Sequence, residues 1–280
     1  MFDVDIICRT LNISVNTLAR ETGLGPVCFS GWNKGKHLPD ARTMEAVYAY
    51  AYGNGLRINL AYEKPFQRLC EKDGFKLLFH GAKKEMKDGP DLFHSKRSND
   101  LGEGFYLGES LMQAAGFVSD YDEALVYSYG LKMKGLKIYE FSLDQKWVLF
   151  IAYNRGYLNE YEGSKKLERL INECKNADVI IAPITDNRMF DIIKEFTRGM
   201  ITDEACRAAL SSLDLGRQYA LKSKKAIDAL GLLKKHYLCK EEKKDYGFQM
   251  AELRKKRYED SAKFLKRNRT GRYIEEILDE

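Results

Sequence analysis

Residues 75–81 read FKLLFHG, a short apolar run that ends in a histidine and a glycine. Its composition and its glycine boundary predict a β-strand, and His80 is one of only four histidines in the chain. A second stretch, DLGEGFYLGES at residues 100–110, places Tyr106 after two glycines. The first stretch predicts a strand that carries His80, and the second predicts a strand that carries Tyr106.

Three further apolar runs are bounded by glycine, asparagine, proline or charged residues: LKIYEFSL (136–143), WVLFIAYN (147–154) and ADVIIAPI (177–184). They predict strands. Helices are expected between them, at residues 110–117, 121–129, 165–175, 189–197 and 202–210. This irregular alternation has no repeated βαβ unit and no phosphate-binding glycine fingerprint, so it favours an α+β domain over a Rossmann sheet.

Composition sets wider limits. The chain of 280 residues has a net charge of +5, which is compatible with nucleic-acid or acidic-ligand contacts but does not require them. Its six cysteines are scattered without the spacing of metal ligands, so no metal is expected. The sequence has neither a leader-like N-terminus nor an apolar stretch of spanning length. We therefore expect a cytoplasmic protein with no membrane association.

The first sixty residues predict helices. Gly23 marks the break between two short helices, and a later helix over residues 41–52 has an apolar stripe of Met44, Val47, Tyr48 and Ala51. The order LARETGL, then WNKGKHLPDARTMEAV, resembles the phage-repressor (Xre-type) helix-turn-helix family over residues 4–60. The recognition position reads GPVCF (25–29), which offers a base little beyond apolar contact, and residues 1–60 carry six basic against five acidic side chains. DNA binding stays open on this basis, and the balance favours a module for partner binding or dimerisation.

The order of FHG and then D-x-G-x-G-F-Y-L resembles the ADP-ribosyltransferase superfamily, in its diphtheria-toxin and poly-ADP-ribose-polymerase branch. The region from Phe75 to Lys235 looks more closely like a bacterial domain family known as DUF3990, which is assigned to that superfamily. Four segments carry this closer resemblance, at residues 90–110, 147–156, 177–188 and 218–233. It implies an α+β domain built on an ADP-ribosyltransferase-like split mixed β-sheet, with NAD+ as substrate.

The resemblance also implies roles for individual residues. His80 would bond the hydroxyls of the nicotinamide ribose, and Tyr106 would stack on the cationic nicotinamide ring. Ser95 and Arg97 would meet the pyrophosphate, and Arg155 would face the phosphates or a target. Each candidate has a plainer structural explanation, which for Ser95, Arg97 and Arg155 taken singly is the more common one. The implied NAD+-binding residues are His80, Gly81, Ser95, Arg97, Gly102, Gly104, Tyr106 and Arg155.

The third element departs from the better-known enzymes. The superfamily places a glutamate at the start of a late strand, beside a tyrosine, and the matching position in GRQYALKS is Gln218, next to Tyr219. A glutamine can accept a hydrogen bond but cannot ionise, so it cannot act as a base. Asp186 is the best alternative source of a carboxylate, and a turn-forming role for Asp186 is equally open. The implied catalytic residues are thus His80, Tyr106, Gln218 and Asp186.

The predicted organisation has four parts. They are a helix-turn-helix-like module (1–62), a connecting helix (63–74), an ADP-ribosyltransferase-like domain (75–238) and a charged helical tail (239–280). Between Glu252 and Arg272 the tail has nine basic and three acidic residues. Binding of nucleic acid and packing of a solvated helix both fit it, and the second is the plainer explanation.

The expected function is that of an NAD+-dependent mono-ADP-ribosyltransferase of bacterial toxin or defence type, with a nucleic acid or protein as acceptor. An NAD+ glycohydrolase is a second hypothesis for the same pocket. A third, from another class, is a helix-turn-helix regulator that senses NAD+ or ADP-ribose without turnover. The fusion is similar to toxin–antitoxin arrangements, so an antitoxin partner belongs to the expectations by analogy.

Overall fold

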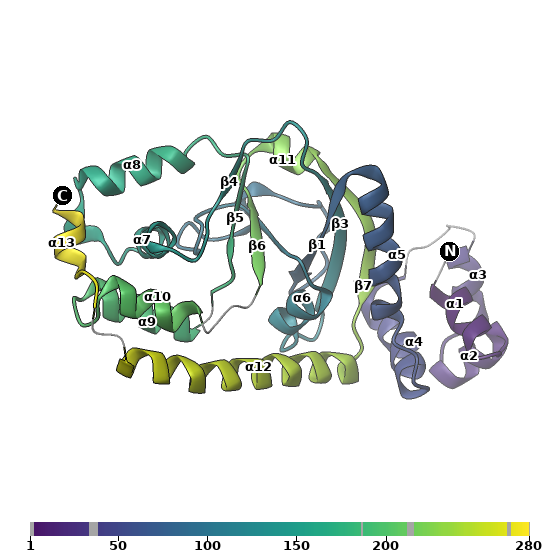
Figure 1. Ribbon diagram of the computed structural model, residues 1–280. Helices are drawn as coiled ribbons and strands as arrows, with labels where there is room; N and C mark the ends of the chain where they lie inside the picture. Colours follow the sequence, from purple (N-terminus) through teal and green to yellow (C-terminus); the bar gives the residue numbers. More distant parts are fainter. Residues whose placement is uncertain (1–2, 34–38, 186, 212–215, 268–269, 280) are drawn as a thin grey trace. The chain divides into compact units, whose positions relative to one another are not determined.

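The computed structural model describes residues 3–33, 39–185, 187–211, 216–267 and 270–279, with backbone alone at residues 33, 94, 187 and 257–267. The chain forms two compact units, and each is assembled from segments that are distant in the sequence (Figure 1). Unit 1 comprises Met1–Lys87, Ser110–Leu131 and Gly231–Met250, and unit 2 comprises Asp88–Glu109, Lys132–Leu230 and Ala251–Glu280. This grouping differs from the consecutive segments expected from the sequence.

Unit 1 contains the N-terminal helices and three strands in the order β1-β3-β7. The expected turn between two short helices is present, because Gly23 ends α2 in the left-handed conformation with φ +68°. The predicted apolar stripe is also present, and Met44, Val47, Tyr48 and Ala51 are the buried residues of α4. The elements are α1 (Asp3–Thr10), α2 (Val15–Thr22), α3 (Pro26–Asn33), α4 (Ala41–Gly53), α5 (Ile58–Asp73), α6 (Leu111–Val118), β1 (Phe75–Ala82), β3 (Leu125–Lys132) and β7 (Leu230–Tyr237).

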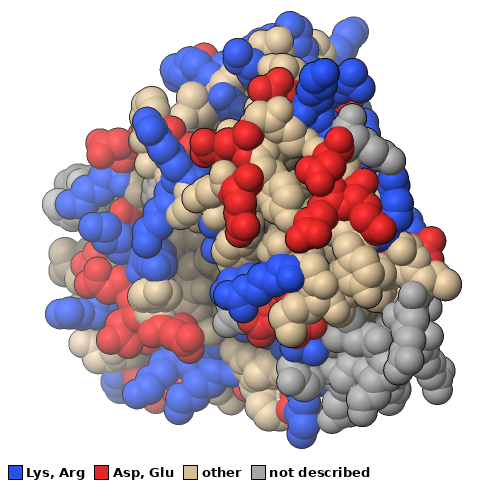
Figure 2. Space-filling model, turned by 90° about the vertical axis from the view of Figure 1, so that its left-hand side faces the viewer, with Lys and Arg blue, Asp and Glu red and all other residues tan. Residues whose placement is uncertain are grey.

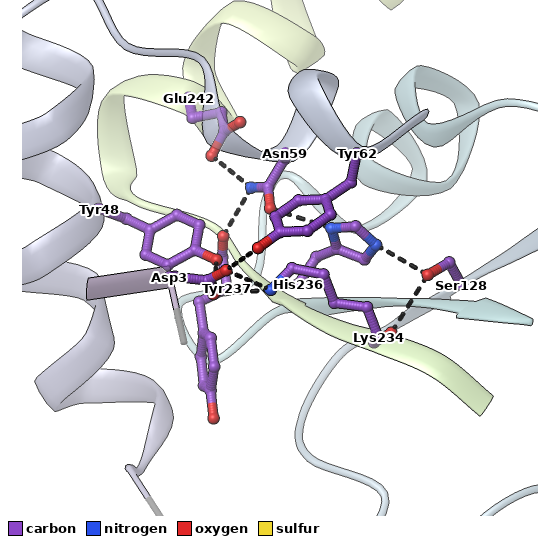
Figure 3. Close-up of polar contacts among 9 residues, drawn as sticks. All are labelled: Asp3, Tyr48, Asn59, Tyr62, Ser128, Lys234, His236, Tyr237 and Glu242. Atoms are coloured by element: carbon purple, nitrogen blue, oxygen red, sulfur yellow. Dashed lines mark hydrogen bonds and ion pairs between the residues drawn. The ribbon is translucent and has the colours of Figure 1, made fainter. Parts of the chain in front are cut away.

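A buried polar network ties the N-terminal helices to β7 within unit 1 (Figure 3). The Asp3 carboxylate on α1 accepts hydrogen bonds of 2.6 Å from the hydroxyls of Tyr48 on α4 and Tyr62 on α5, and its oxygens lie 2.6 and 2.7 Å from Nζ of Lys234 on β7. Burial alone would raise the pKa of Asp3, but Lys234 and the two hydroxyls hold it below its usual value. These contacts join α1, α4 and α5 to β7 within unit 1.

A second part of this network surrounds His236, which is 1 % exposed. Its Nδ1 lies 3.0 Å from Oδ1 of Asn59, and its Nε2 lies 3.0 Å from Oγ of Ser128. Asn59 donates in turn to the carbonyl of Tyr237 at 2.8 Å and to the carboxylate of Glu242 at 2.9 Å. Burial lowers the pKa of His236 to about 3, so its imidazole is neutral at physiological pH.

Unit 2 is built on four strands in the order β4-β5-β6-β2. The β4–β5 pair is parallel, whereas β5–β6 and β6–β2 are antiparallel, so this part of the sheet is mixed as expected. Tyr106 pairs with Ala220 and Gly108 pairs with Gln218 across β2 and β6. The strands are β2 (Phe105–Gly108), β4 (Ile138–Glu140), β5 (Val179–Pro183) and β6 (Arg217–Leu221).

Helices supply most of the core of unit 2. Trp147, Ile192 and Phe196 are fully buried there, together with Ile277 near the C-terminus. Ser164 binds the carbonyl of Leu278 at 2.8 Å, which fixes the last helix to the start of α8. The helices are α7 (Gln145–Asn154), α8 (Lys165–Cys174), α9 (Asn187–Thr197), α10 (Asp203–Ser211), α11 (Lys224–Asp228) and α13 (Ile274–Leu278), with short 3₁₀ turns η1 (Leu92–His94) and η2 (Asn159–Tyr161).

Two secondary-structure expectations are wrong. WVLFIAYN forms helix α7 instead of a strand, because all six residues from Trp147 to Ala152 are buried and the continuous apolar run hides the helical period. The Asp144 carboxylate caps this helix by accepting from the amide of Trp147 at 3.0 Å. The predicted helix at residues 121–129 is a turn followed by strand β3, which is buried from Leu125 to Leu131.

The expected charged tail forms α12 (Lys240–Arg267) and α13. The 28-residue helix α12 contributes to unit 1 up to Met250 and to unit 2 from Ala251. On the face drawn in Figure 2, basic and acidic side chains are interspersed, so the side chains described there form no extended basic patch. Among the described helices, none combines the length and the apolar character needed to cross a membrane.

Candidate functional site

The candidate site in unit 2 is centred on the loop from Asn99 to Gly104, which leads into β2. Gly102 has φ +76°, a conformation that favours glycine, and its amide donates to the carbonyl of Asn99 at 2.8 Å. A Cβ on Gly104 would lie 2.6 Å from the carbonyl oxygen of Leu221 on β6. The two glycines are therefore required by the turn and by the close approach of β6.

Tyr106 is bonded to the loop that precedes it. Its hydroxyl donates to the carbonyl of Gly102 and accepts from the amide of Leu101 at 3.1 Å. Burial, and after it the charge of Asp100, raise the pKa of Tyr106, so the hydroxyl stays protonated. Ser95 accepts from the amide of Gly104 at 3.0 Å, which gives this candidate pyrophosphate ligand a bond to the loop.

Arg155, expected near the phosphates, pairs with the carboxylate of Asp100. Its Nε donates to Oδ1 at 2.9 Å and its Nη2 contacts the same oxygen, while the guanidinium lies 3.9 Å from the centre of the Phe190 ring. The hydroxyl of Thr185 donates to the other carboxylate oxygen. Nδ2 of Asn154 also donates to the carbonyl of Asp100 at 3.2 Å, so the end of α7 holds the start of the loop.

The ammonium of Lys222 also binds the loop. It donates to the carbonyl of Leu101 at 2.7 Å and to the carbonyl of Glu103. Arg97 lies farther out: its side chain is 89 % exposed, and Nε is 3.9 Å from the carboxylate of Glu103. Among the basic side chains of Arg97, Arg155 and Lys222, that of Arg97 is the one whose charge faces solvent and could reach a ligand.

Gln218 lies on the same sheet face as Tyr106. The pairs Tyr106–Ala220 and Gly108–Gln218 are two residues apart, and side chains two residues apart project from one face of a strand. Gln218 is 9 % exposed, and its Nε2 donates to the carbonyl of Pro183 at 3.0 Å. Asp186, the other expected source of a third element, lies outside the described residues.

Tyr219 lies on β6, and Glu109 directly follows the last residue of β2. The Tyr219 hydroxyl donates to Oε1 of Glu109 at 2.8 Å. Burial, followed by this bond, raises the pKa of Tyr219. Glu109 directly follows Gly108, the residue that pairs with Gln218. A carboxylate therefore lies one residue beyond that pair.

His80 and Gly81 belong to β1 of unit 1, and His80 is 7 % exposed. A Cβ on Gly81 would overlap the carbonyl oxygen of Ala114, so this glycine is needed where α6 packs on β1. The structure brings together Tyr106, Gly102, Ser95 and Arg155 within unit 2. Because His80 belongs to the other unit and each unit is described by itself, a shared site with Tyr106 stays a prediction.

Sequence reasoning gave no role to several residues that shape this loop. Asp100 belongs to the loop, and Thr185 and Lys222 bind the loop from segments far away in the chain; the apolar strand pattern carries no signal for such contacts. Asn154 ends the apolar run at residues 147–154, and that run does not predict its contact with the carbonyl of Asp100. Among the described residues, no group of three or more His, Cys, Asp or Glu side chains could hold a metal ion.

Comparison with known proteins gives one family. The profile of a family described as a protein of unknown function (DUF3990) matches residues 76–232, which is more than half of the chain. No curated protein and no solved structure matches the chain. The matched residues begin in β1 and end in β7, so they include the whole candidate site. The chain therefore belongs to the DUF3990 family.

Proposed function

We propose that this protein is an NAD+-dependent mono-ADP-ribosyltransferase that modifies a nucleic acid or a protein, of the kind used as a bacterial toxin or in defence. In this reaction the bond between nicotinamide and ribose breaks, nicotinamide leaves, and the anomeric carbon bonds to the acceptor. The chain must then bind a cationic ring and stabilise positive charge on the ribose. The proposal leaves open whether the N-terminal helices bind DNA or a partner protein.

One observation carries the proposal: Tyr106 and Gln218 share one face of the β2–β6 pair. They are diagonal neighbours across antiparallel strands, for which side chains are about 7 Å apart. That spacing suits an aromatic ring under the nicotinamide and an amide beside the attached ribose. It is also the arrangement implied by the resemblance to the superfamily, in which a tyrosine and a glutamate occupy these two strands.

Gln218 decides how much chemistry the pair can do. Its amide oxygen can accept a hydrogen bond from a ribose hydroxyl, but it brings no charge to the oxocarbenium ion. Its Nε2 is held by the carbonyl of Pro183, which fixes the orientation of the amide. The proposed enzyme thus positions the ribose and relies on a reactive acceptor, or draws charge from another carboxylate, for which Asp186 is the best candidate in the sequence.

The test follows NAD+ labelled in the adenylate phosphate, incubated with the full chain and with RNA, DNA and protein fractions that are resolved afterwards. Transferase activity transfers label to one fraction and releases nicotinamide in equal amount. Free ADP-ribose without transfer would indicate the NAD+ glycohydrolase. Binding of NAD+ with neither product would indicate a sensor, an outcome that the non-ionisable Gln218 favours. Absence of NAD+ binding would refute both enzymes, and absence of binding to both NAD+ and ADP-ribose would refute all three hypotheses.

Substitutions then test the residues. Tyr106→Ala should raise the Kd for NAD+ about tenfold, because it removes a stacking surface for a cationic ring. Tyr153→Ala on α7 is the matched control, since Tyr153 is 41 % exposed, and it should leave the Kd unchanged. His80→Ala should lower turnover about 10- to 100-fold, and lower it more than it weakens NAD+ binding.

Two changes at Gln218 separate its roles. Gln218→Glu should keep or raise the release of nicotinamide, because a carboxylate stabilises the charge that builds on the ribose. Gln218→Ala should depress it. If both variants turn over NAD+ like the parent, Gln218 is not the third element, and Asp186→Asn becomes the next variant to assay.

A further inference from the structure

Lys222 fills a space that two glycines leave open. The residue directly follows β6, where its amide donates to the carbonyl of Asp178 at 2.8 Å. A Cβ on Gly104 would lie 3.3 Å from Cδ of Lys222, and a Cβ on Gly102 would lie 3.3 Å from its Nζ. The Lys222 side chain thus lies closely alongside the loop. It can take this position because Gly102 and Gly104 have no side chains.

The ammonium binds the loop on both sides of Gly102. It donates to the carbonyl of Leu101 at 2.7 Å and to that of Glu103, which are one residue before and one residue after Gly102. Gly102 supplies the carbonyl to which the hydroxyl of Tyr106 donates, and the amide of Leu101 donates to the same hydroxyl. Both backbone partners of Tyr106 therefore belong to the segment that Lys222 holds.

We propose that Lys222 is a positioning residue, which fixes the Leu101–Glu103 segment and through it the ring of Tyr106. The inference deepens the proposed function and rests on it where NAD+ binding is concerned, since Tyr106 is the residue expected under the nicotinamide. Lys222 itself does not touch the ligand. Its effect on NAD+ passes through the two backbone groups that hold the tyrosine hydroxyl.

The surroundings of Lys222 fit this role better than that of a base or nucleophile. Its hydrogen bonds go to two backbone carbonyls, and charge-assisted bonds of this kind are about twice as strong as neutral ones. Burial lowers the pKa of Lys222 to about 8, against the opposing effects of Glu103 and Cys174. Neutralising the amine above that pH weakens the two bonds without any substitution.

The experiment places 3-fluorotyrosine at position 106 of the full chain and records its ¹⁹F resonance without NAD+. Lys222→Met removes the ammonium and keeps an unbranched side chain, so it should shift or broaden the resonance. Lys224→Met, two residues away and on an exposed side chain paired with Asp228, is the matched control and should leave the resonance in place. The parent resonance should also move with a midpoint near pH 8, and this titration should be absent from Lys222→Met.

Steady-state assays give the second readout. A displaced Tyr106 weakens a stacking contact that ground and transition states share, so Lys222→Met should raise KM for NAD+ about fivefold and keep kcat within twofold. An unchanged resonance in Lys222→Met, or a fall in kcat at constant KM, would overturn the proposal. If Lys222→Met fails to fold, the pH titration of the parent decides, and a resonance that is flat from pH 7 to 9 overturns it. A parent that does not bind NAD+ refutes the proposed function, while the ¹⁹F readout still decides what Lys222 does to Tyr106.

Discussion

Glu242 makes the stability of unit 1 dependent on pH in a direction opposite to that of most carboxylates. This residue on α12 is 3 % exposed. Burial raises its pKa from 4.5 to about 7, although hydrogen bonds from Asn59 and Tyr246 and the charge of Arg57 act to lower it, and Asp245 adds to the increase. The folded chain therefore holds this proton over a pH range in which the unfolded chain has lost it.

The sign and the size of the effect follow from that difference. Between pH 4.5 and 7 the folded state binds one proton more than the unfolded state, so the free energy of unfolding falls as pH rises. A shift of about two and a half pKa units corresponds to roughly 3 kcal/mol. This contribution is complete below pH 4.5 and is lost above pH 7.

Glu242→Gln removes the titration and keeps an amide of similar shape. Relative to the parent, the variant should gain roughly 3 kcal/mol of unfolding free energy between pH 4.5 and pH 8. Glu241→Gln is the matched control, because Glu241 precedes it on the same helix and is exposed. The difference between Glu241→Gln and the parent should not change over this range.

The two tryptophans make the measurement specific to one unit. Trp32 belongs to unit 1 and Trp147 to unit 2, so a Trp147→Phe background leaves Trp32 as the fluorescent reporter of unit 1. Urea unfolding followed at pH 5, 6, 7 and 8 gives the free energy of unfolding at each pH. Parallel curves for Glu242→Gln and the parent would mean that Glu242 is not buried against Asn59, and the reasoning would be refuted.

Two further predictions concern stability. Gly104→Ala should lower the free energy of unfolding by about 1–3 kcal/mol, because its Cβ would meet the backbone carbonyl of Leu221. Gly25→Ala, with nothing within 4 Å of the added carbon, should have little effect, and equal melting temperatures for the two variants would contradict the packing of β2 on β6. Asp3→Asn should cost about 3–5 kcal/mol, since it leaves the buried ammonium of Lys234 without its carboxylate. Adding Lys234→Met should restore part of that loss in denaturant unfolding, and strictly additive losses would argue against the pair.

The sequence predicted those elements whose pattern is local. Three such predictions are confirmed: the strand at residues 75–81, the apolar stripe of α4 and the glycine that ends α2. Each depends only on residues that are close together in the sequence. The strand expected at WVLFIAYN was wrong because burial on every side removes the periodicity that separates a helix from a strand. Asp144, which caps α7, was the one local signal that could have identified the helix.

Contacts between residues that are far apart in the sequence could not be predicted from local sequence patterns. Asp3 pairs with Lys234, and Lys222 binds the carbonyl of Leu101, across 231 and 121 positions respectively. Nothing in the residues around Asp3 distinguishes a buried ion pair from the acidic first turn of an exposed helix, which stabilises a helix N-terminus on its own. Only the fold specifies the partner.

Gln218, one candidate for the third element, lies beside β5, the strand that precedes the other candidate, Asp186, in the sequence. Gln218 pairs with Ala182 on β5, and its amide donates to the carbonyl of Pro183, the last residue of that strand. Asp186 follows Pro183 by three positions, and Thr185 between them donates to Asp100, which in turn pairs with Arg155. A carboxylate introduced by Gln218→Glu would therefore face the end of β5, from which the segment carrying Asp186 departs. For that reason the effects of Gln218→Glu and Asp186→Asn on nicotinamide release should not be additive, whereas two unconnected residues would give additive effects.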